Sequence, residues 1–397
     1  MPLEDYRRQV WNCYRCSSGE YVSLWEMKSK RFSKICPSVT RFLWDIYACH
    51  GKMDCARALI DGKLQWNDTL IDAIYKCTLC AACDVRCKRA GVINVLEVLE
   101  ELRAKCVEDG FLKIPAHRKT LESLKRYGNP FGVAERQQRI VWAQELEFNV
   151  KIMPKEKAPV LLYVGSMYAL EPIVRETIKS IARVLKMAEV NFGLIENEID
   201  DGLYALQLGE RGLFEEIAEK NIKIFNDLGI QTLITPDPHA YNAFKRYYPK
   251  IGKIEAKVLH VTEYLQELIE CGKIKLKASF NGLTITYHDP CNLGRVCGLY
   301  EPPRKIIESL RGVEFNEMER IKNNAWCCGA GGGVMAAYPE FMAWTANERI
   351  EEAESTGSSI LVTSCPWCEY TFKTAVEAKK SHLGVYNIIE LLEKACG

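Results

Sequence analysis

Five cysteines in the last third of the chain limit what this sequence can fold around. They are Cys291, the vicinal pair Cys327 and Cys328, and the pair Cys365 and Cys368. The gaps between the three groups are nearly equal, at 35 and 36 residues. Cysteine usually occurs singly as a small buried hydrophobe, whereas grouped thiolates select soft metals. Five thiolates are too many for one zinc ion. A larger thiolate-bound centre is therefore predicted, with structural zinc or scattered core thiols as the alternatives.

A second cysteine group lies near the N-terminus. Its members, Cys77, Cys80, Cys83 and Cys87, follow the Cys-x2-Cys-x2-Cys-x3-Cys spacing of bacterial ferredoxins. In two-cluster ferredoxins the fourth cysteine of each run ligates the other cubane, so a second run is expected nearby. Cys13 and Cys16 open such a run, and Cys36, followed by proline, closes it. The middle is abnormal, because 19 residues separate Cys16 from Cys36 and Phe32 occupies a slot expected to hold cysteine.

The crossover rule assigns the N-terminal ligands to two cubane [4Fe-4S] clusters. One cubane is expected on Cys36, Cys77, Cys80 and Cys83, and the other on Cys13, Cys16 and Cys87, which leaves it one ligand short. Cys49, on a turn, is favoured as the fourth ligand over Cys55, which lies inside a helix. The remaining alternative is that neither binds, and that this cluster is a three-iron species or has a ligand other than cysteine.

Composition restricts the class of protein further. The chain has 397 residues, 48% of them hydrophobic, which allows two or three domains with sizeable cores. It contains neither a long apolar run nor a signal peptide, so no direct membrane span is expected. A chain of this length with 18 cysteines in ligand-like groups favours a reducing cytoplasm over a disulfide scaffold. The net charge of +1 gives no footprint for nucleic acid.

An internal repeat covers most of the remaining chain. Residues 160–245 can be laid over residues 283–373, and each copy reads as strand, helix, longer helix and strand. The expected strands begin at Val160 and Leu283, and the expected helices are 172–185 and 214–228 in the first copy and 303–310 and 340–355 in the second. Alternating strands and helices predict parallel α/β halves. Helices are also predicted over 68–75 and 95–107.

The first copy lacks the cysteines of the second. Asp200 and Asp201 stand where the second copy has Cys327 and Cys328, and Asp237 and Ala240 stand where it has its Cys-x-x-Cys. Carboxylates replace thiolates poorly at an iron-sulfur cluster, so no cluster is expected in this copy. An acid pair with His239 allows a hard-metal or proton-handling site, although paired aspartates at a turn more often cap a helix or lie in a solvated loop.

The spacing of the five cysteines and two flanking stretches resembles the CCG domain of the heterodisulfide reductase family. The stretches are residues 287–295, Tyr-His-Asp-Pro-Cys-Asn-Leu-Gly-Arg, and residues 327–333, Cys-Cys-Gly-Ala-Gly-Gly-Gly. The resemblance implies that Cys291, Cys327, Cys328, Cys365 and Cys368 hold a non-cubane [4Fe-4S] cluster. In that family, the protein that cleaves a heterodisulfide has two ligand-complete halves. This chain retains one, as in the one-cluster relatives.

The resemblance implies an α+β multidomain fold. Residues 1–112 are expected to form an α-helical ferredoxin module with two cubane sites, followed by a helical connector over 113–155. Residues 156–275 then form a CCG half without ligands, and residues 276–397 form the CCG half that binds the non-cubane cluster. These two halves make up a duplicated α/β CCG domain with parallel strands.

The expected function is that of an iron-sulfur electron-transfer subunit in an anaerobic oxidoreductase complex. Two cubanes would relay electrons to or from the non-cubane cluster, which would act on a disulfide or thiol substrate. The alternative is a non-catalytic relay between a flavoprotein and a membrane quinone-reactive subunit. Such partners imply a cytoplasmic subunit or one attached to the cytoplasmic face of a membrane complex.

A few single residues complete the sequence-based expectations. His288 and Asp289 precede a ligand, and His288 is a candidate proton relay, whereas Asp289-Pro290 is equally typical of a turn that aims Cys291. The glycines after Cys328 would leave room for backbone to approach the cluster. Because no dinucleotide-binding Gly-x-Gly-x-x-Gly follows a strand, no intrinsic flavin is expected. Four cysteines fit no ligand interval and are expected to be plain thiols: Cys106, Cys271, Cys297 and Cys396.

Overall fold

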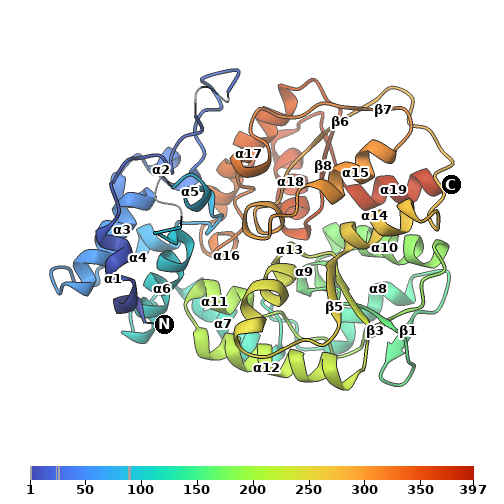
Figure 1. Cartoon of the computed structure of the whole chain (residues 1–397), viewed down its shortest axis with the longest axis horizontal. Coiled ribbons are helices and arrows are strands. Elements are labelled where there is room, and N and C mark those ends of the chain that lie inside the picture. Colours follow the sequence, from blue (N-terminus) through green and yellow to red (C-terminus); the bar gives the residue numbers. More distant parts are fainter. Residues whose placement is uncertain (1, 24, 26, 88–90) are drawn as a thin grey trace.

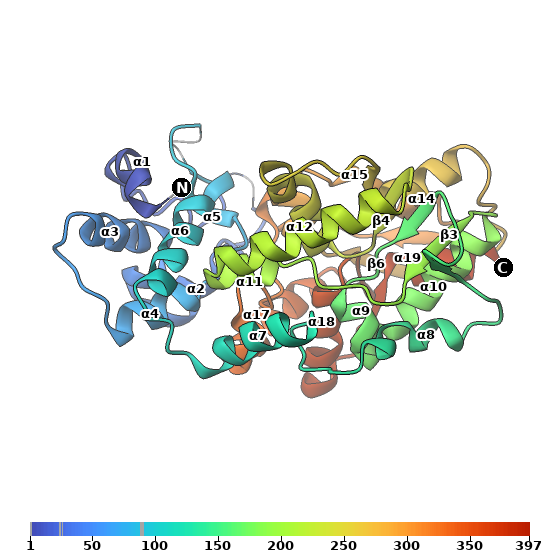
Figure 2. The same cartoon turned by 90° about the horizontal axis from the view of Figure 1, so that it is seen from below.

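The computed structural model consists of a helical N-terminal module and two parallel sheets with helices packed around them (Figure 1). It describes residues 2–23, 25, 27–87 and 91–397. The helical module lies at one end, and the C-terminus lies at the other (Figures 1 and 2). Within the described residues, no helix is both long and apolar enough to cross a membrane.

The N-terminal module contains short helices, and most of its cysteines lie in the segments that connect them. The helices are η1 (Leu3–Tyr6), α1 (Arg7–Trp11), α2 (Pro37–Phe42), η3 (Asp45–Tyr47), α3 (Cys49–Ile60), α4 (Asp68–Tyr75), α5 (Ala82–Val85) and α6 (Val95–Glu108). The expected helix over 68–75 is present, because the Asn67 side chain caps its first turn and Leu70, Ile71 and Ile74 are buried. The expected helix over 95–107 is α6, one residue longer.

The segment expected to be a helical connector contains α7 (Pro115–Tyr127), η4 (Arg136–Ile140) and α8 (Val141–Gln144). It also contains a strand that the sequence analysis did not predict. This strand, β1 (Lys151–Met153), pairs in parallel with β3 (Phe192–Ile195) at the edge of the first sheet. The sheet therefore begins before residue 156.

The first sheet has the strand order β1-β3-β2-β4-β5 and is entirely parallel. Its remaining elements are β2 (Val160–Leu162), α9 (Ser166–Leu170), η5 (Pro172–Val174), α10 (Arg175–Met187), α11 (Leu203–Leu208), α12 (Arg211–Asp227), β4 (Thr232–Thr235), α13 (Pro238–Asn242), η6 (Ala243–Tyr247), η7 (Tyr248–Lys250), β5 (Lys257–His260) and α14 (Val261–Glu270). The single helix predicted over 172–185 is wrong at its start, because residues 172–174 form the separate turn η5.

The second sheet has the order β7-β6-β8-β9. Its elements are β6 (Leu283–Tyr287), η8 (Asn292–Val296), α15 (Glu301–Ser309), β7 (Val313–Phe315), η9 (Lys322–Asn324), α16 (Val334–Ala337), α17 (Pro339–Glu354), β8 (Ile360–Thr363), α18 (Pro366–Lys379), β9 (Gly384–Asn387) and α19 (Ile388–Cys396). Without β1, the first sheet has the corresponding order β3-β2-β4-β5.

The last helix of each half begins in the same way. A capping box opens α14 at His260 and Glu263, directly after β5, and another opens α19 at Asn387 and Glu390, directly after β9. Each box satisfies backbone N–H groups that a helix start would leave unpaired. The two halves therefore share local chemistry as well as strand order.

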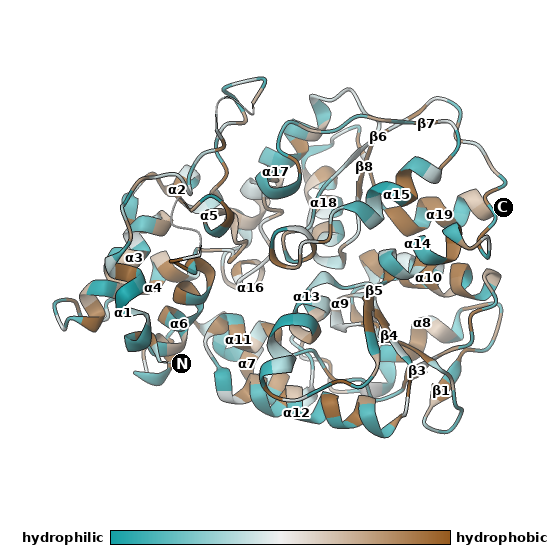
Figure 3. Ribbon diagram, in the orientation of Figure 1, coloured by the Kyte–Doolittle hydropathy of each residue, from teal (hydrophilic) through white to brown (hydrophobic). Residues whose placement is uncertain are grey.

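The hydrophobic core lies between the modules. One buried cluster joins apolar residues of α4 and α6 to residues of the first half, and a second joins the two sheets through side chains such as Leu162, Ile285 and Val362. The halves pack α10 against α19 and α14 against α15. Figure 3 shows apolar residues along the strands and polar residues on outward helix faces. The modules thus share core surface rather than meeting only through linkers.

A buried carboxyl at one of these interfaces generates a pH prediction. Glu100 on α6 accepts a hydrogen bond from the Tyr247 hydroxyl of the first half at 2.7 Å. Burial raises the pKa of Glu100 from an ordinary value of 4.5 to about 7. Between these pH values the folded protein keeps a proton that the unfolded chain has released, so the free energy of unfolding falls as pH rises through this window.

Glu100→Gln should flatten that dependence by up to about 3 kcal/mol between pH 5 and 8. Denaturant unfolding under anaerobic conditions measures it. Glu97→Gln is the matched control, because Glu97 lies one turn earlier on α6 and its side chain is 26% exposed. An equal slope in wild type and Glu100→Gln would contradict the assignment.

Candidate iron-sulfur sites

The five cysteines of the second half come together at one end of its sheet. Cys291 directly precedes η8, Cys327 and Cys328 lie in the loop before α16, and Cys365 and Cys368 begin α18. Cys327 hydrogen-bonds with the thiols of Cys291 and Cys328, Cys328 also with Cys368, and Cys368 with Cys365. The five residues that the sequence singled out therefore form one continuous thiol group.

Electrostatics differ across this group. Cys328 accepts hydrogen bonds from Cys327 and Cys368, which lowers its pKa well below the ordinary value for a thiol. Burial raises the pKa of Cys365 and Cys368. A soft metal would displace the remaining thiol protons, because the thiolate is the ligand form.

Gly331 and Gly332 line the cavity of this thiol group and also make a contact that was not expected. A Cβ at Gly331 would lie 2.6 Å from the Thr78 carbonyl oxygen, and one at Gly332 would lie 2.5 Å from that of Cys77. Gly332 also has a positive φ of 60°, which disfavours other residues. The glycine loop therefore makes room for the backbone of the N-terminal ferredoxin run.

The first half supplies one wall of the cavity that this thiol group lines. Tyr204, Gln207 and His239 face it, together with Trp367 from the Cys-x-x-Cys segment. The Gln207 Oε1 atom accepts from Gly332 N–H and lies 3.2 Å from His239 Nε2, which assigns the proton of this imidazole to Nε2. Burial lowers the His239 pKa to about 3, so its ring is neutral. The copy without cysteines thus contributes polar groups to the centre of the other.

Cys36 lies near the ferredoxin run of residues 77–87, with which the crossover rule groups it. Cys36 and Cys83 each interact with the thiols of Cys77 and Cys80. Burial raises the pKa of Cys36 to about 12, and Lys52 opposes this effect. The assignment of these four thiols to one cubane remains a prediction, and their proximity is compatible with it.

The other N-terminal cavity is lined by five cysteines: Cys13, Cys16, Cys49 and Cys87, together with Cys83 from the run assigned to the other cubane. Cys49 is the first residue of α3 rather than part of a turn, and its pKa is lowered chiefly by a hydrogen bond from Cys83. A helix N-terminus also favours a thiolate. Cys55 lies one and a half turns further along α3 and is not among the residues that line the cavity. The geometry therefore favours Cys49 as the missing ligand.

Gly19 explains why this ligand comes from elsewhere in the chain. It stands three residues after Cys16, at the third cysteine position of a ferredoxin run counted from its start. A Cβ at Gly19 would lie 2.7 Å from the Sγ of Cys49. The thiol of Cys49 therefore occupies the space into which a cysteine at position 19 would project. From the sequence, the missing cysteine of this run was expected at position 32. Phe32 instead packs beneath the guanidinium groups of Arg31 and Arg320.

The insertion between Cys16 and Cys36 connects the N-terminal module to the second half. Backbone bonds pair Val22 with Ser33 and Ile35 with Glu20, while Arg31 binds Glu348 on α17. As a result, Val22 and Ile35 cover Cys80 and Cys327 in a small apolar cluster. Such a shell limits access of solvent to a metal centre.

Cys80 and Cys327 form the junction between the N-terminal module and the second half. Their side chains hydrogen-bond to each other, although they belong to different thiol groups. Two metal centres held by these groups would share a protein contact at their edges. The positions are 247 residues apart, and neither motif alone predicts this proximity.

In the first half, the positions that correspond to the cysteines also converge. Ser166 Oγ donates to Asp200 Oδ2 at 2.6 Å, and the charges of Asp200 and Asp237 act on Asp201. Arg139 pairs with Glu198 beside them at 2.8 Å. Asp200 and Asp201 are 5% and 3% exposed, so the solvated-loop alternative is wrong.

These aspartates bind backbone N–H groups of the turn that leads into α11, whose N-cap residue, Gly202, has no side-chain cap. Asp200 accepts from Gly202 N–H and Asp201 from Leu203 N–H, at the start of α11. A hydrogen-bonded acid network therefore fills the place that the thiol group has in the other half.

His288 and Asp289 have mainly structural surroundings. The His288 Nδ1 atom accepts a hydrogen bond from Arg349 Nε at 3.1 Å, and His288 is not among the residues lining the cavity. Burial and the charge of Arg349 lower its pKa well below the ordinary value. Asp289 pairs with Arg304 at 2.7 Å, in agreement with its role in a turn. The proton-relay role of His288 stays a prediction, and the histidine that faces the cavity is His239.

Two buried guanidinium groups support the fit of anionic clusters. Arg103 is fully buried, and Arg295 is 9% exposed. Neither forms an ion pair with a carboxylate among the described residues, and each interacts with the charges of nearby cysteines. An unpaired buried cation is costly, whereas a thiolate-bound iron-sulfur cluster supplies negative charge. The donor atoms and the surrounding charge thus both suit iron-sulfur clusters.

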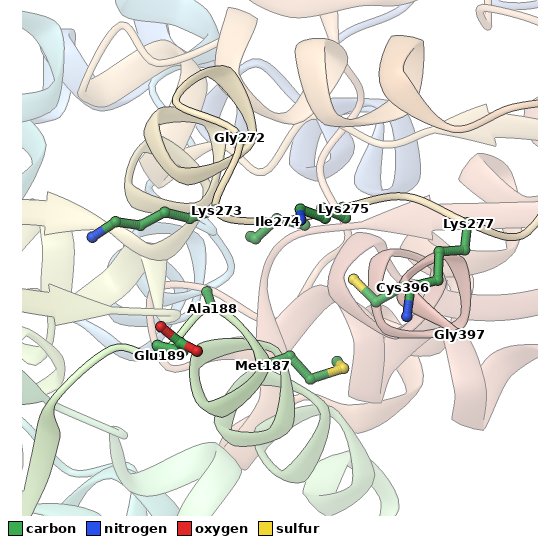
Figure 4. A pocket seen from close by; sticks show the side chains of 10 residues that line it. All are labelled: Met187, Ala188, Glu189, Gly272, Lys273, Ile274, Lys275, Lys277, Cys396 and Gly397. Atoms are coloured by element: carbon green, nitrogen blue, oxygen red, sulfur yellow. The ribbon is translucent and has the colours of Figure 1, made fainter.

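Another surface pocket lies beside the C-terminus, away from the three thiol groups (Figure 4). Its lining includes Met187, Glu189, Lys273 and Cys396. One cysteine among mixed charges and apolar atoms does not resemble a ligand set. Cys396, like Cys106, Cys271 and Cys297, is absent from the lining of both cysteine cavities.

Comparison with known proteins places this geometry in a family. The cysteine-rich CCG domain matches residues 285–373. The chain is 30% identical over 332 residues to a component of the dihydromethanophenazine:CoB–CoM heterodisulfide reductase of Methanosarcina acetivorans, covering 82% of this chain and 78% of the relative. The chain belongs to the heterodisulfide reductase family of CCG-domain iron-sulfur oxidoreductase subunits.

Other relatives are longer. "Probable iron-sulfur-binding oxidoreductase FadF" of Bacillus subtilis is 35% identical over 349 residues, covering 84% of this chain and 48% of the relative. "EtfAB:quinone oxidoreductase" of Syntrophomonas wolfei is 29% identical, covering 82% and 46%. The chain thus spans about half the length of these two proteins. A crystal structure of a hypothetical protein from Helicobacter pylori shares the fold with a TM-score of 0.52 at 12% identity, covering 77% of this chain and 58% of that one.

These relationships support an iron-sulfur protein with a role in electron transfer. Sequence reasoning identified the cysteines but missed the residues that surround them, namely Gly19, Arg103, Tyr204, Gln207 and Arg295. For Gly19 a signal was present, because the regular spacing from Cys13 and Cys16 leads to it. For the others, no local pattern indicates that distant segments meet at the thiols.

The relation between Gly19 and Cys49 can be tested by moving the ligand. Cys49→Ala should remove one iron, or a whole cluster, of about twelve irons. Adding Gly19→Cys to Cys49→Ala should restore the iron, because the new thiol projects into the same space. Iron and sulfide analysis with EPR spectroscopy measures both effects on anaerobically purified protein. Cys55→Ala is the control from the same helix and should retain all iron. Full iron in Cys49→Ala would exclude Cys49 as a ligand.

Proposed function

We propose that the chain is an electron-transfer subunit that connects two cubane clusters to a non-cubane cluster acting on a disulfide or thiol substrate. The proposed cubane ligands are Cys13, Cys16, Cys49 and Cys87 for one cluster and Cys36, Cys77, Cys80 and Cys83 for the other. Cys291, Cys327, Cys328, Cys365 and Cys368 hold the non-cubane cluster. The observation that carries the proposal is the contact between Cys80 and Cys327, because it adjoins the ferredoxin run to the CCG thiol group.

The arrangement gives the electrons a direction along the molecule. Cys16 is exposed, whereas Cys327, Cys328, Cys365 and Cys368 are buried. Electrons would therefore enter or leave at the outer cubane, where a redox partner has access, and exchange with substrate at the enclosed centre. Bound there, a non-cubane iron-sulfur cluster supplies single electrons and a site for substrate sulfur.

The first half contributes the substrate side of the centre in this proposal. Reduction of a disulfide consumes two electrons and two protons and yields two thiols. His239 and Gln207 give the cavity a polar side, while Tyr204 and Trp367 enclose it with aromatic surface. The half without cysteines would thus orient the substrate. In family members with two ligand-complete halves, the resemblance implies that both halves face the substrate.

A second candidate function is an electron relay without a substrate of its own. It is favoured by the relative "EtfAB:quinone oxidoreductase", whose name pairs a flavoprotein with a quinone. In this role the chain would pass electrons between a flavoprotein and a membrane quinone-reactive subunit, attached at the cytoplasmic face of the membrane. The same three clusters would serve, but no disulfide would react.

One experiment separates the two functions. Anaerobically purified protein, reduced with dithionite and freed of excess reductant, is mixed with the CoB–CoM heterodisulfide or with cystine. The disulfide function predicts oxidation of the clusters, measured by absorbance near 400 nm, with release of two thiols per two electrons. Cys328→Ser, in which both cubanes should remain, should lose this reaction by at least tenfold.

Cys271→Ser is the control variant, because Cys271 is an exposed thiol that lines neither cysteine cavity. It should oxidise at close to the wild-type rate. If neither disulfide oxidises the wild-type protein while a quinone analogue or an electron-transfer flavoprotein does, the relay function is correct instead.

A further inference from the structure

Arg295 lies at the junction of two thiol groups. It belongs to η8, four residues after Cys291, and is 9% exposed. Its Nε atom donates to the carbonyl oxygen of Cys80 at 2.7 Å, and its Nη1 atom donates to that of Ala325. One side chain therefore ties the ferredoxin run to the segment that leads into Cys327.

The remaining nitrogen of this guanidinium has no protein partner. Nη2 is buried without a hydrogen bond among the described residues. An unsatisfied buried donor on a charged group costs free energy, so a native protein is expected to use it. Thiolate and cluster sulfur atoms accept hydrogen bonds in iron-sulfur proteins, and such bonds change the cluster potential.

The charge of Arg295 acts on both sites at once. Its guanidinium binds the carbonyl oxygens of Cys80 and of Ala325, two residues before Cys327, and its backbone lies four residues after Cys291. Cys80 belongs to the cubane proposed on Cys36, Cys77, Cys80 and Cys83, which we call the inner cubane. Cys291 and Cys327 belong to the proposed non-cubane cluster. No carboxylate among the described residues pairs with Arg295 to cancel its field, in contrast to Arg304 and Arg320 in the same half.

A fixed positive charge stabilises the more negative, reduced form of a nearby cluster. The effect is large where water is excluded, because the dielectric constant is low, and Val22 and Ile35 cover this junction. Placed between two clusters, the charge also offsets the repulsion that an electron on one cluster exerts on an electron entering the other.

We propose that Arg295 is the positioning residue that couples the inner cubane to the non-cubane cluster, by raising the reduction potentials of both through one shared guanidinium. The inference rests on the proposed three-cluster function. It gives an electrostatic role to the arginine that ends the stretch 287–295 around Cys291. The outer cubane, on Cys13, Cys16, Cys49 and Cys87, lies outside the set of thiols with which Arg295 interacts and should not depend on it.

Redox titration of the EPR signals tests this proposal in the full chain. Arg295→Gln keeps donors for the two carbonyl bonds but removes the charge. It should make reduction of both the inner cubane and the non-cubane cluster at least tenfold less favourable, which is 59 mV per one-electron step. The potential of the outer cubane should stay unchanged. A purely structural role would not predict a shift restricted to these two signals.

Two further variants keep the test decisive. Arg295→Lys retains the charge but loses the planar fork, so it should shift the same two potentials by less. If Arg295→Gln does not retain its clusters, the potentials of Arg295→Lys are measured in its place. Arg139→Gln, a buried arginine paired with Glu198 in the first half, is the control and should shift none. Unchanged potentials, or equal shifts of all three, would overturn the role of Arg295. Fewer than three cluster signals in the wild type would instead refute the proposed function.

Discussion

The structure depends on one buried arginine without a carboxylate partner. Arg103 on α6 donates hydrogen bonds to the carbonyl oxygens of Ile74 and Cys77 in the N-terminal module, Gln207 in the first half and Gly332 in the second. Five donors in a rigid fork suit a point where three chain segments meet. Because Arg103 is fully buried, its charge is costly, and a negative cluster held by the thiols around Cys77 would offset that cost. Assembly of the modules and negative charge at the cysteines are therefore linked.

This linkage explains how the sites are distributed. None of the three thiol groups lies in isolation within its module. The Gly331-Gly332 backbone contacts Cys77 and Thr78, the 17–35 insertion binds α17 through Arg31, and the first half closes the cavity beside Cys365 through His239. Metal binding in such an arrangement contributes to folding, because ligands from separate segments must be held together. A short path between the centres is a direct consequence of this packing.

The sequence was informative where a residue acts through its neighbours in the chain. The strand Leu283–Tyr287, the helix Asp68–Tyr75 and the cysteine motifs follow from periodicity and spacing, and the structure contains both elements as predicted. The wall formed by Tyr204 and Gln207, and the bridging roles of Arg103 and Arg295, arise from contacts between distant segments. Gly19 is intermediate, since its position in the run is readable but its partner Cys49 is set by where α3 begins. The strand β1 escaped prediction because its three residues pair only at a sheet edge supplied by the later strand β3.

The central claim is that three thiol groups, and not the acid network of the first half, hold iron. Anomalous diffraction at the iron absorption edge, from crystals grown anaerobically, tests this most directly. The account predicts three separate iron peaks: among Cys13, Cys16, Cys49 and Cys87; among Cys36, Cys77, Cys80 and Cys83; and among the five cysteines of the second half. A peak beside Asp200, Asp201 and Asp237, or none at Cys291, Cys327, Cys328, Cys365 and Cys368, would contradict it.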